Sequence, residues 1–180
     1  MEVNDIKWKR VHHGFIDVPL IDYLENLVNE QYELGIKLKI CVGTDSQKKG
    51  KGFSYASAII IEMKVPLGGD VYKGVGAKVI SGTYYEKFKS SKHRPSITER
   101  MLNEVQTSIN VCYYLLDLIE LYDIDLEIHA DVNPNPMWAS HVAFNQVKGY
   151  CEGMNIPYRV KPDAYAASHG ADRWANKGVL

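Results

Sequence analysis

The chain has 180 residues, of which 46% are hydrophobic, and its formal net charge at pH 7 is −1. This length suits one domain with a sizeable core, so we expect residues 1–180 to form a single domain. The nearly balanced charge excludes a protein held on nucleic acid or a membrane by a global positive field, so any affinity for polyanions must be local.

The chain also lacks the sequence features of secreted and membrane-spanning proteins. No secretory leader opens it, and no apolar run approaches about 18 residues. The three cysteines are far apart and stand in apolar patterns, which predicts buried thiols in a reducing compartment. They are Cys41, Cys112 and Cys151. We therefore expect a cytoplasmic protein.

The first half of the chain predicts one helix followed by three strands. Residues 19–34 carry apolar side chains at helical spacing and end at Gly35, a common helix cap. Residues 37–44, 53–63 and 70–81 have the apolar and β-branched composition of strands, with glycine-rich turns between them. Strands joined by such short turns form an antiparallel meander.

The second half predicts helices that alternate with short strands. Ser96 and Glu99 have the capping-box spacing at the start of a helix that runs to about residue 121. A strand at 125–130, a helix from about 139 to 154 and a strand at 156–160 follow. After Pro162 comes a last helix with a stripe of small residues that can lie close to a sheet. The stripe consists of Ala164, Ala167, Ala171 and Ala175.

Acidic residues stand at the expected ends of two of these strands. Asp45 follows the strand at 37–44, and Asp131 follows the strand at 125–130. An ionised carboxylate that is buried without a partner is strongly unfavourable, so such groups pair, bind a cation or face solvent. These two aspartates are therefore candidates for a functional site, with turn formation as the alternative.

The helix that starts near Ser96 offers two further carboxylates. At about 100° per residue, the centre of its apolar face leaves Glu104 on the flank and Glu99 nearly opposite. Glu99 also has a capping role available. We therefore expect Glu104 to be the functional carboxylate, with Glu99 as the alternative.

Several segments resemble the YkuK-like branch of the ribonuclease H-like proteins, a bacterial and phage family. They are residues 42–47, 98–104, 128–131, 161–168 and 171–173. The resemblance implies the ribonuclease H-like fold, an α/β fold with a mixed sheet. Its order is three antiparallel strands followed by helix, strand, helix, strand and helix. Residues 37–177 would form this core, and residues 1–35 would be an N-terminal extension with an extra helix.

The resemblance also implies a metal-dependent nuclease. In active members, four acidic residues hold two divalent cations, and Asp45, Glu104, Asp131 and Asp172 occupy the corresponding places. Mg²⁺ or Mn²⁺ suits such oxygen ligands, and two ions can clamp the attacking and leaving oxygens of a phosphodiester. The implied substrate is nucleic acid, with RNA or an RNA–DNA hybrid favoured, and the products would carry 3′-hydroxyl and 5′-phosphate ends.

Other polar residues are expected around these carboxylates. His169, three residues before Asp172, is a candidate proton shuttle or phosphate contact. A basic segment precedes the long helix, whose N-terminus favours anions. The expected contacts with nucleic acid are Ser46, Gln47, Asn133, Lys87, Lys89, Lys92 and Arg94. Their alternative interpretation is as turn residues and solvated loop residues.

Two other functions stay open from the sequence. One is a nucleic-acid-binding or scaffold module with a residual metal site. The other is an endonuclease similar to Holliday-junction resolvases, which would act on structured DNA with the same carboxylates. The protein is expected to be a monomer or a homodimer and to have no membrane partner.

Overall fold

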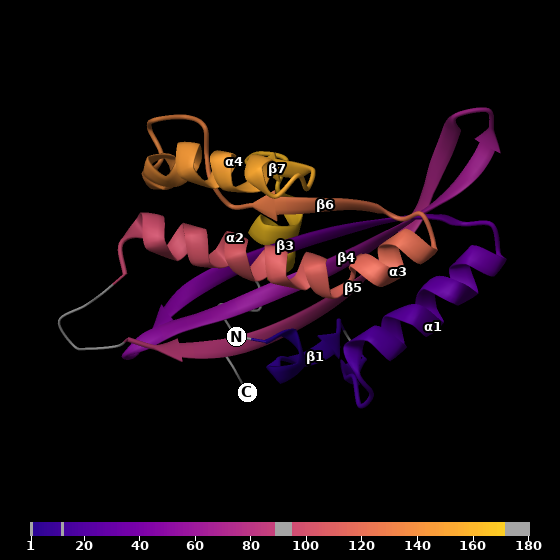
Figure 1. Cartoon of the computed structure of the whole chain (residues 1–180), viewed down its shortest axis with the longest axis horizontal. Helices are drawn as coiled ribbons and strands as arrows, with labels where there is room; N and C mark the ends of the chain where they lie inside the picture. Colours follow the sequence, from indigo (N-terminus) through magenta and orange to yellow (C-terminus); the bar gives the residue numbers. More distant parts are fainter. Residues whose placement is uncertain (1, 12, 89–94, 172–180) are drawn as a thin grey trace.

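The computed structural model describes residues 2–11, 13–88 and 95–171, and its central feature is a seven-stranded sheet (Figure 1). The strand order is β2-β1-β5-β4-β3-β6-β7. The strands are β1 (Lys7–Arg10), β2 (Gly14–Phe15), β3 (Lys37–Lys49), β4 (Gly52–Gly68), β5 (Val71–Lys87), β6 (Asp125–Ala130) and β7 (Tyr158–Val160). The helices are η1 (Val3–Asp5), α1 (Leu20–Glu33), α2 (Ile97–Tyr114), α3 (Leu116–Leu121), η2 (Ala139–Ala143), α4 (Phe144–Gly153) and η3 (Ala166–Ala171).

The predicted antiparallel meander is confirmed as β3, β4 and β5, and the sheet continues with β6 and β7 parallel to β3. All three meander strands are longer than predicted. Polar residues such as Lys48 still pair with β4, because the ladder is built from main-chain hydrogen bonds rather than from apolar side chains. Asp45 therefore lies within β3, opposite Ala56, and the expectation that it ends a strand is wrong.

The N-terminal segment adds two strands that the sequence pattern does not predict. β1 pairs antiparallel with β5 and places Trp8 opposite Gly82. The Trp8 side chain is buried, and its indole N–H donates to the carbonyl of Val3 over 3.1 Å. A Cβ atom at Gly82 would lie closer than 3.0 Å to side-chain atoms of Ile6 and Trp8. The contact between β1 and β5 thus depends on a glycine more than 70 residues away in sequence.

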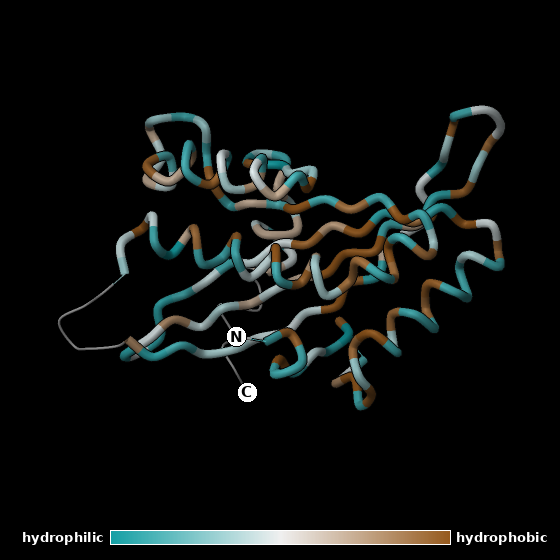
Figure 2. The backbone as a smooth tube through the Cα atoms, in the orientation of Figure 1, coloured by the Kyte–Doolittle hydropathy of each residue, from teal (hydrophilic) through white to brown (hydrophobic). Residues whose placement is uncertain are grey.

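The helices divide between the two faces of the sheet. Apolar side chains of α1, α2 and α4 pack with alternate residues of the strands, such as Ile40, Val42 and Ile59, in the main hydrophobic core. The brown stretches of strand and helix in Figure 2 trace this layer. The intervening strand residues, Cys41 and Ile60 among them, face η3 on the other side. This alternation is the expected period of a strand with both faces covered.

Several helix boundaries also differ from the prediction. The helix expected to run to residue 121 is interrupted at Leu115, which separates α2 from α3. The helix predicted from residue 139 begins as the 3-10 turn η2, and the described part of the last helix, η3, is a π-helix. The capping box is confirmed: Ser96 Oγ accepts from the Glu99 amide at 3.2 Å, and a Glu99 carboxylate oxygen accepts from the Ser96 amide at 2.6 Å.

None of the helices in the described ranges combines the length and the apolar character needed to cross a bilayer.

Candidate active site

The pairing of β3 with β6 brings two predicted site residues to the same end of the sheet. The last printed pair of these parallel strands is Gly43 with His129. Asp45 and Asp131 each follow that pair by two residues, so Asp45, within β3, and Asp131, just beyond the end of β6, lie at the same level. β6 ends at Ala130, so no strand pairs with β3 on this side beyond Gly43 in the described ranges.

Helix α2 supplies a third carboxylate to this place. Glu104 has an exposed fraction of only 2%, and the Ser46 hydroxyl donates to its Oε1 at 2.6 Å. One turn further along α2, the Ser108 hydroxyl donates to Thr44 Oγ1 at 2.9 Å. Thr44 in turn bonds to Ser57 of β4, also at 2.9 Å. This buried hydroxyl network holds α2, and with it Glu104, at a defined height above β3.

The environment of Glu104 disfavours its charge. Burial raises the pKa of this carboxyl well above its usual 4.5, and repulsion from Asp45 raises it further, with a smaller contribution from Asp131. The Ser46 hydrogen bond and the Arg100 guanidinium, whose Nε lies 3.9 Å from Oε1, oppose the shift but do not cancel it. Three acidic groups from β3, α2 and the end of β6 therefore act on one another.

These residues fit a divalent cation by the chemistry of their donor atoms. Carboxylate oxygens are the ligands that Mg²⁺ and Mn²⁺ prefer, and a cation would remove the repulsion that raises the Glu104 pKa. In the part of the chain that the structure describes, however, the oxygens of Asp45, Glu104 and Asp131 do not all lie within 4.8 Å of one another. The fourth predicted ligand, Asp172, lies outside the described residues.

Asp131 already has a cationic neighbour. Lys161 Nζ lies 2.9 Å from Asp131 Oδ1, and the Asp131 side chain is 18% exposed. The contact is an ion pair without the geometry of a hydrogen bond, and buried Oδ1 finds no hydrogen-bond partner within the described ranges. The Lys161 ammonium thus already supplies part of the positive charge that a metal ion would bring to Asp131.

The structure separates the two candidate carboxylates of α2. Glu99 is exposed in the first turn, where it forms the capping box. Glu104 is buried beside Ser46 and within electrostatic reach of Asp45 and Asp131. The position of Glu104, rather than that of Glu99, is thus the one that faces the two aspartates.

The predicted contacts with nucleic acid have different surroundings. Ser46 is fully buried, and its hydroxyl is bonded to Glu104, whereas Gln47 is half-buried on β3. Asn133 accepts from the Asn135 amide at 2.9 Å, as a turn residue does. His169 is exposed on η3, and Lys87 is exposed at the end of β5. The remaining basic candidates, Lys89, Lys92 and Arg94, lie outside the described residues.

A second polar group, not predicted from the sequence, lies under η3. Ligand atoms of Cys41, Glu127 and His129 all lie within 4.8 Å of one another, a spacing compatible with a bound metal ion. Their registers on β3 and β6 bring them together, since Cys41 pairs with Glu127. The sequence signal for this group is faint, because alternating polar residues in a short strand are equally typical of a solvent-facing strand.

The bonding of this group favours a structural role over a metal site. The Ala166 amide donates to His129 Nδ1 at 3.0 Å, so neutral His129 carries its hydrogen on Nε2, the atom that would have to bind a metal. Glu127 is already paired with two cations, Lys39 and Arg159. Burial raises the pKa of the Cys41 thiol, which keeps it protonated.

Close packing of η3 against β3 completes this end of the molecule. A Cβ atom on Gly43 would lie closer than 3.0 Å to the backbone of Ala166 and Ala167, so η3 rests directly on the glycine. Further along, Ala171 packs against Ala56, the residue paired with Asp45. Ala167 and Ala171 of the predicted small-residue stripe thus approach the sheet closely, as expected, and Ala175 lies outside the described residues.

Comparison with known proteins gives one family. The model of the family described as Ribonuclease H-like matches residues 20–176, which include all the carboxylates discussed above. No curated protein and no solved structure gave a significant match.

Proposed function

The chain belongs to the ribonuclease H-like family, and we propose that it is a divalent-metal-dependent nuclease that hydrolyses phosphodiester bonds in nucleic acid. The observation that carries the proposal is the buried carboxylate of Glu104, whose pKa is raised by burial and then by the charges of Asp45 and Asp131. Acids placed where they repel one another are costly to a fold, and a bound cation gives that arrangement a purpose. The YkuK-like branch is the proposed group within the family.

In this proposal, Asp45, Glu104, Asp131 and Asp172 hold two Mg²⁺ or Mn²⁺ ions. When bound, such ions lower the pKa of a water molecule and neutralise charge on the leaving oxygen. Ser46 orients Glu104 through its 2.6 Å hydrogen bond. The exposed imidazole of His169 is free to meet solvent, which suits a proton shuttle or a phosphate contact.

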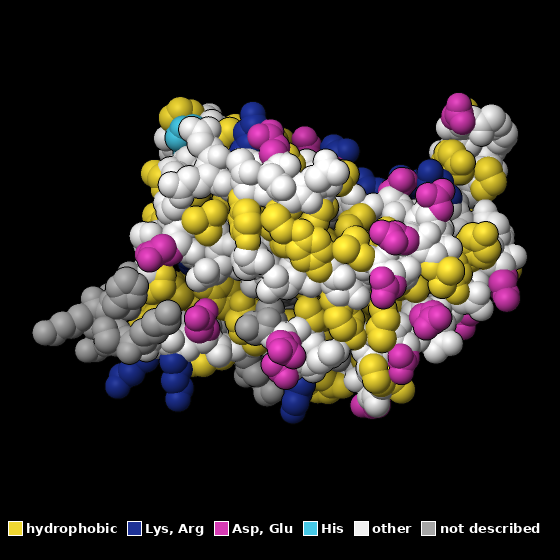
Figure 3. Space-filling model, viewed as in Figure 1, with side chains coloured by type: hydrophobic (Ala, Val, Ile, Leu, Met, Phe, Trp, Pro, Cys, Tyr) yellow, Lys and Arg dark blue, Asp and Glu magenta, His cyan; other side chains and the backbone are white. Residues whose placement is uncertain are grey.

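The proposed substrate is RNA or an RNA–DNA hybrid. The face in Figure 3 carries scattered acidic side chains, with Lys and Arg side chains mainly at its edges, so a broad electrostatic attraction for duplexes is not expected there. Cleavage of structured DNA by a homodimer, as in Holliday-junction resolvases, would use the same carboxylates and differs only in the substrate surface.

A second candidate function is a nucleic-acid-binding or scaffold module with a residual metal site. The ion pair of Lys161 with Asp131 favours it, because the ammonium already compensates one of the proposed ligands. It is also favoured because, in the described ranges, the oxygens of Asp45, Glu104 and Asp131 do not all lie within 4.8 Å of one another.

Cleavage of labelled substrates distinguishes the two functions. Single-stranded RNA, an RNA–DNA hybrid, duplex DNA and a four-way junction would be incubated with Mg²⁺ or Mn²⁺ and intact protein, Asp45→Asn or Asp117→Asn. Asp117 is an exposed residue of α3 and serves as the matched control. We expect Asp45→Asn to lower the cleavage rate by about 100-fold or more and Asp117→Asn to leave it unchanged. Binding without metal-dependent cleavage by any of the three proteins would instead support the binding module.

A further inference from the structure

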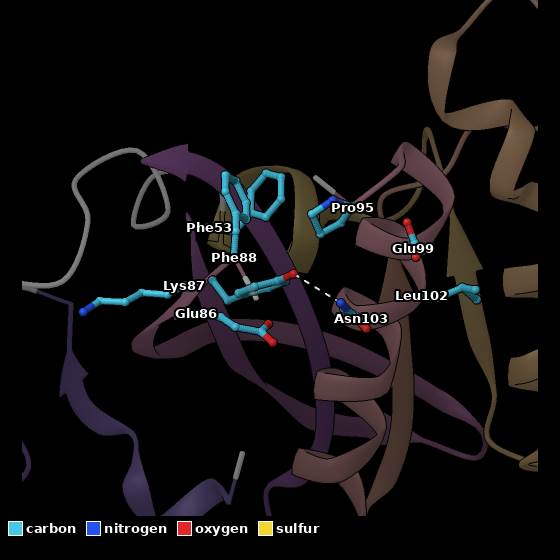
Figure 4. Close-up of a pocket in the computed structure, with 9 residues that line it drawn as sticks. Phe53, Glu86, Lys87, Phe88, Pro95, Glu99, Leu102 and Asn103 are labelled. Atoms are coloured by element: carbon cyan, nitrogen blue, oxygen red, sulfur yellow. Dashed lines mark hydrogen bonds between the residues drawn. The ribbon is translucent and has the colours of Figure 1, made fainter. Parts of the chain in front are cut away.

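A cavity of about 340 Å³ lies between the start of α2, the first residues of β4 and the last residues of β5 (Figure 4). Aromatic and apolar side chains meet polar ones in its wall. The lining residues are Phe53, Tyr55, Glu86, Lys87, Phe88, Pro95, Glu99, Leu102 and Asn103. The proposed function leaves this cavity without a role.

The cavity lies next to the candidate active site. Tyr55 is the cross-strand partner of Ser46, the residue that bonds to Glu104, and neighbouring strands are about 5 Å apart. Asn103 directly precedes Glu104 on α2. A second hollow, lined in part by Gln106 and Asn110, shares Glu86 and Asn103 with the first. The two hollows are therefore continuous along the side of α2 that faces β5, beside the helical turn that carries Glu104.

The aromatic part of the cavity has a defined arrangement. Phe53 meets Phe88 edge to face, with ring centroids 5.3 Å apart and an interplanar angle of 73°. Tyr55 forms the floor: its exposed fraction is 1%, and it stacks on Tyr84 at 5.0 Å. Phe53 and Phe88 are only half-buried, so part of each ring is open to a ligand. Such half-open rings suit a flat, apolar partner.

The polar groups in the wall indicate which part of a nucleic acid would enter. The carboxylates of Glu86 and Glu99 line the cavity and disfavour a phosphate there. The Lys87 side chain extends away from the aromatic rings, as Figure 4 shows, so its ammonium does not offset the charges of the two carboxylates. Asn103 donates to the Tyr55 hydroxyl over a long 3.5 Å, and its amide oxygen is available to accept from a ring amino group.

We propose that this cavity binds one unpaired nucleobase of the strand that the active site cleaves. The base stacks on the ring of Phe88 and meets the ring of Phe53 at its edge, since the two rings are nearly perpendicular. Its amino or imino hydrogens face Asn103 and Glu86, and its phosphate stays outside. The inference rests on the proposed function, since it names a subsite for the same substrate. It predicts a preference for single-stranded or locally unpaired nucleic acid.

Binding of short labelled RNA in EDTA, followed by fluorescence anisotropy, tests the subsite without requiring catalysis. Phe88→Leu keeps an apolar side chain but removes the ring, and Asn103→Ala removes the amide. Tyr72→Ala, at an exposed aromatic residue of the β4–β5 hairpin, is the matched control. We expect Phe88→Leu to weaken binding by about 5- to 100-fold, the range for the loss of one stacked base, and the control to bind normally.

An RNA series with one abasic position adds a test of contact. At the position whose base enters the cavity, the abasic RNA should bind the wild type as weakly as Phe88→Leu binds intact RNA, and combining both changes should add nothing. Unchanged binding by folded Phe88→Leu and Asn103→Ala would overturn the subsite. Cleavage that still depends on Asp45 in that case would leave the proposed nuclease intact. If the substitutions weaken RNA binding as expected but the wild type cleaves no substrate with Mg²⁺ or Mn²⁺, the nuclease proposal alone is refuted.

Discussion

At the scale of single residues, Glu104 and Glu127 are two buried glutamates with opposite electrostatic surroundings. Burial and the charges of Asp45 and Asp131 raise the pKa of Glu104. Burial also opposes the charge of Glu127, but its hydrogen bond and ion pair with Lys39, together with Arg159, outweigh that effect and lower its pKa. The cation beside Glu104, Arg100, does not cancel the effect of burial and repulsion, whereas the cations beside Glu127 do.

The Glu104→Gln variant is expected to be more stable than the wild type in EDTA at pH 8. A carboxyl whose pKa is raised by folding stabilises the fold below its unfolded pKa, and this contribution is lost as pH rises through the raised value. Glutamine has no charge to lose. Thermal unfolding at pH 4.5 and pH 8 measures the difference, which should shrink at the lower pH.

Addition of Mg²⁺ should reverse the order, because the cation stabilises the native wild type in proportion to its binding. Glu25→Gln, at an exposed position of α1, controls for a general effect of net charge. A Glu104→Gln variant no more stable than the wild type in EDTA would contradict the repulsion argued here.

The Glu127→Gln variant is expected to lose stability instead, by about 1–2 kcal/mol at pH 7, because Lys39 is left partly buried without its carboxylate. A lowered pKa means that this stabilisation is present above the unfolded pKa and is lost as pH falls through the folded one. Urea unfolding at pH 7 and at about pH 3 measures it. An equal loss at both pH values would point to packing rather than charge.

At the scale of elements, the approach of η3 to β3 governs the geometry of the candidate site. Gly43 has no side chain, so the backbone of Ala166 and Ala167 rests on it. The Ala166 amide then reaches His129 Nδ1, which ties η3 to β6 as well. β3, which carries Asp45, and β6, which Asp131 directly follows, are thus both in contact with the last described helix.

Gly43→Ala should therefore separate η3 from the sheet. The added methyl group cannot be accommodated by a flexible side chain, since its neighbours are backbone atoms, and we expect a loss of about 2–3 kcal/mol. Urea unfolding and hydrogen exchange of the η3 amides measure the effect. Gly149→Ala, in open space on α4, is the control and should stabilise the protein by about 0.5–1 kcal/mol. Unaltered exchange in η3 would show that the helix does not depend on this contact.

At the scale of the whole molecule, one sheet connects the N-terminal strands to the C-terminal ones. β1 is hydrogen-bonded to β5, and its buried Trp8 belongs to the same core as α1 and α2. We therefore expect the N-terminal segment to unfold together with the rest of the sheet.

Trp8→Ala is expected to destabilise the entire fold by about 3–5 kcal/mol, as large-to-small changes in a core do. Circular dichroism and tyrosine fluorescence should report one coincident unfolding transition, because the affected core spans the sheet. Exposed Trp138 provides the matched substitution, Trp138→Ala, with little expected effect. Two separate transitions would mean that the N-terminal segment unfolds independently.

Elements with strong local patterns could be predicted from the sequence. The period of α1, the capping box of α2 and the glycine-rich turns of the meander are properties of neighbouring residues. β1 and the break at Leu115 carry no such pattern. β1 exists because Gly82 leaves room for Trp8, and β3 extends to Lys49 because β4 continues to pair with it.

Local spacing was thus enough to indicate α1, the meander and the alternation of helices and strands after it, and to single out Asp45, Asp131 and Glu104. The ribonuclease H-like fold and Asp172 came from the resemblance to a family. Which groups meet was a matter of packing. The register of β3 with β6 aligns Asp45 with Asp131 and also assembles Cys41, Glu127 and His129. The hydroxyl network under α2 sets the height of Glu104 above them. Contacts between residues so far apart in sequence depend on strand register and helix docking, neither of which a local pattern encodes.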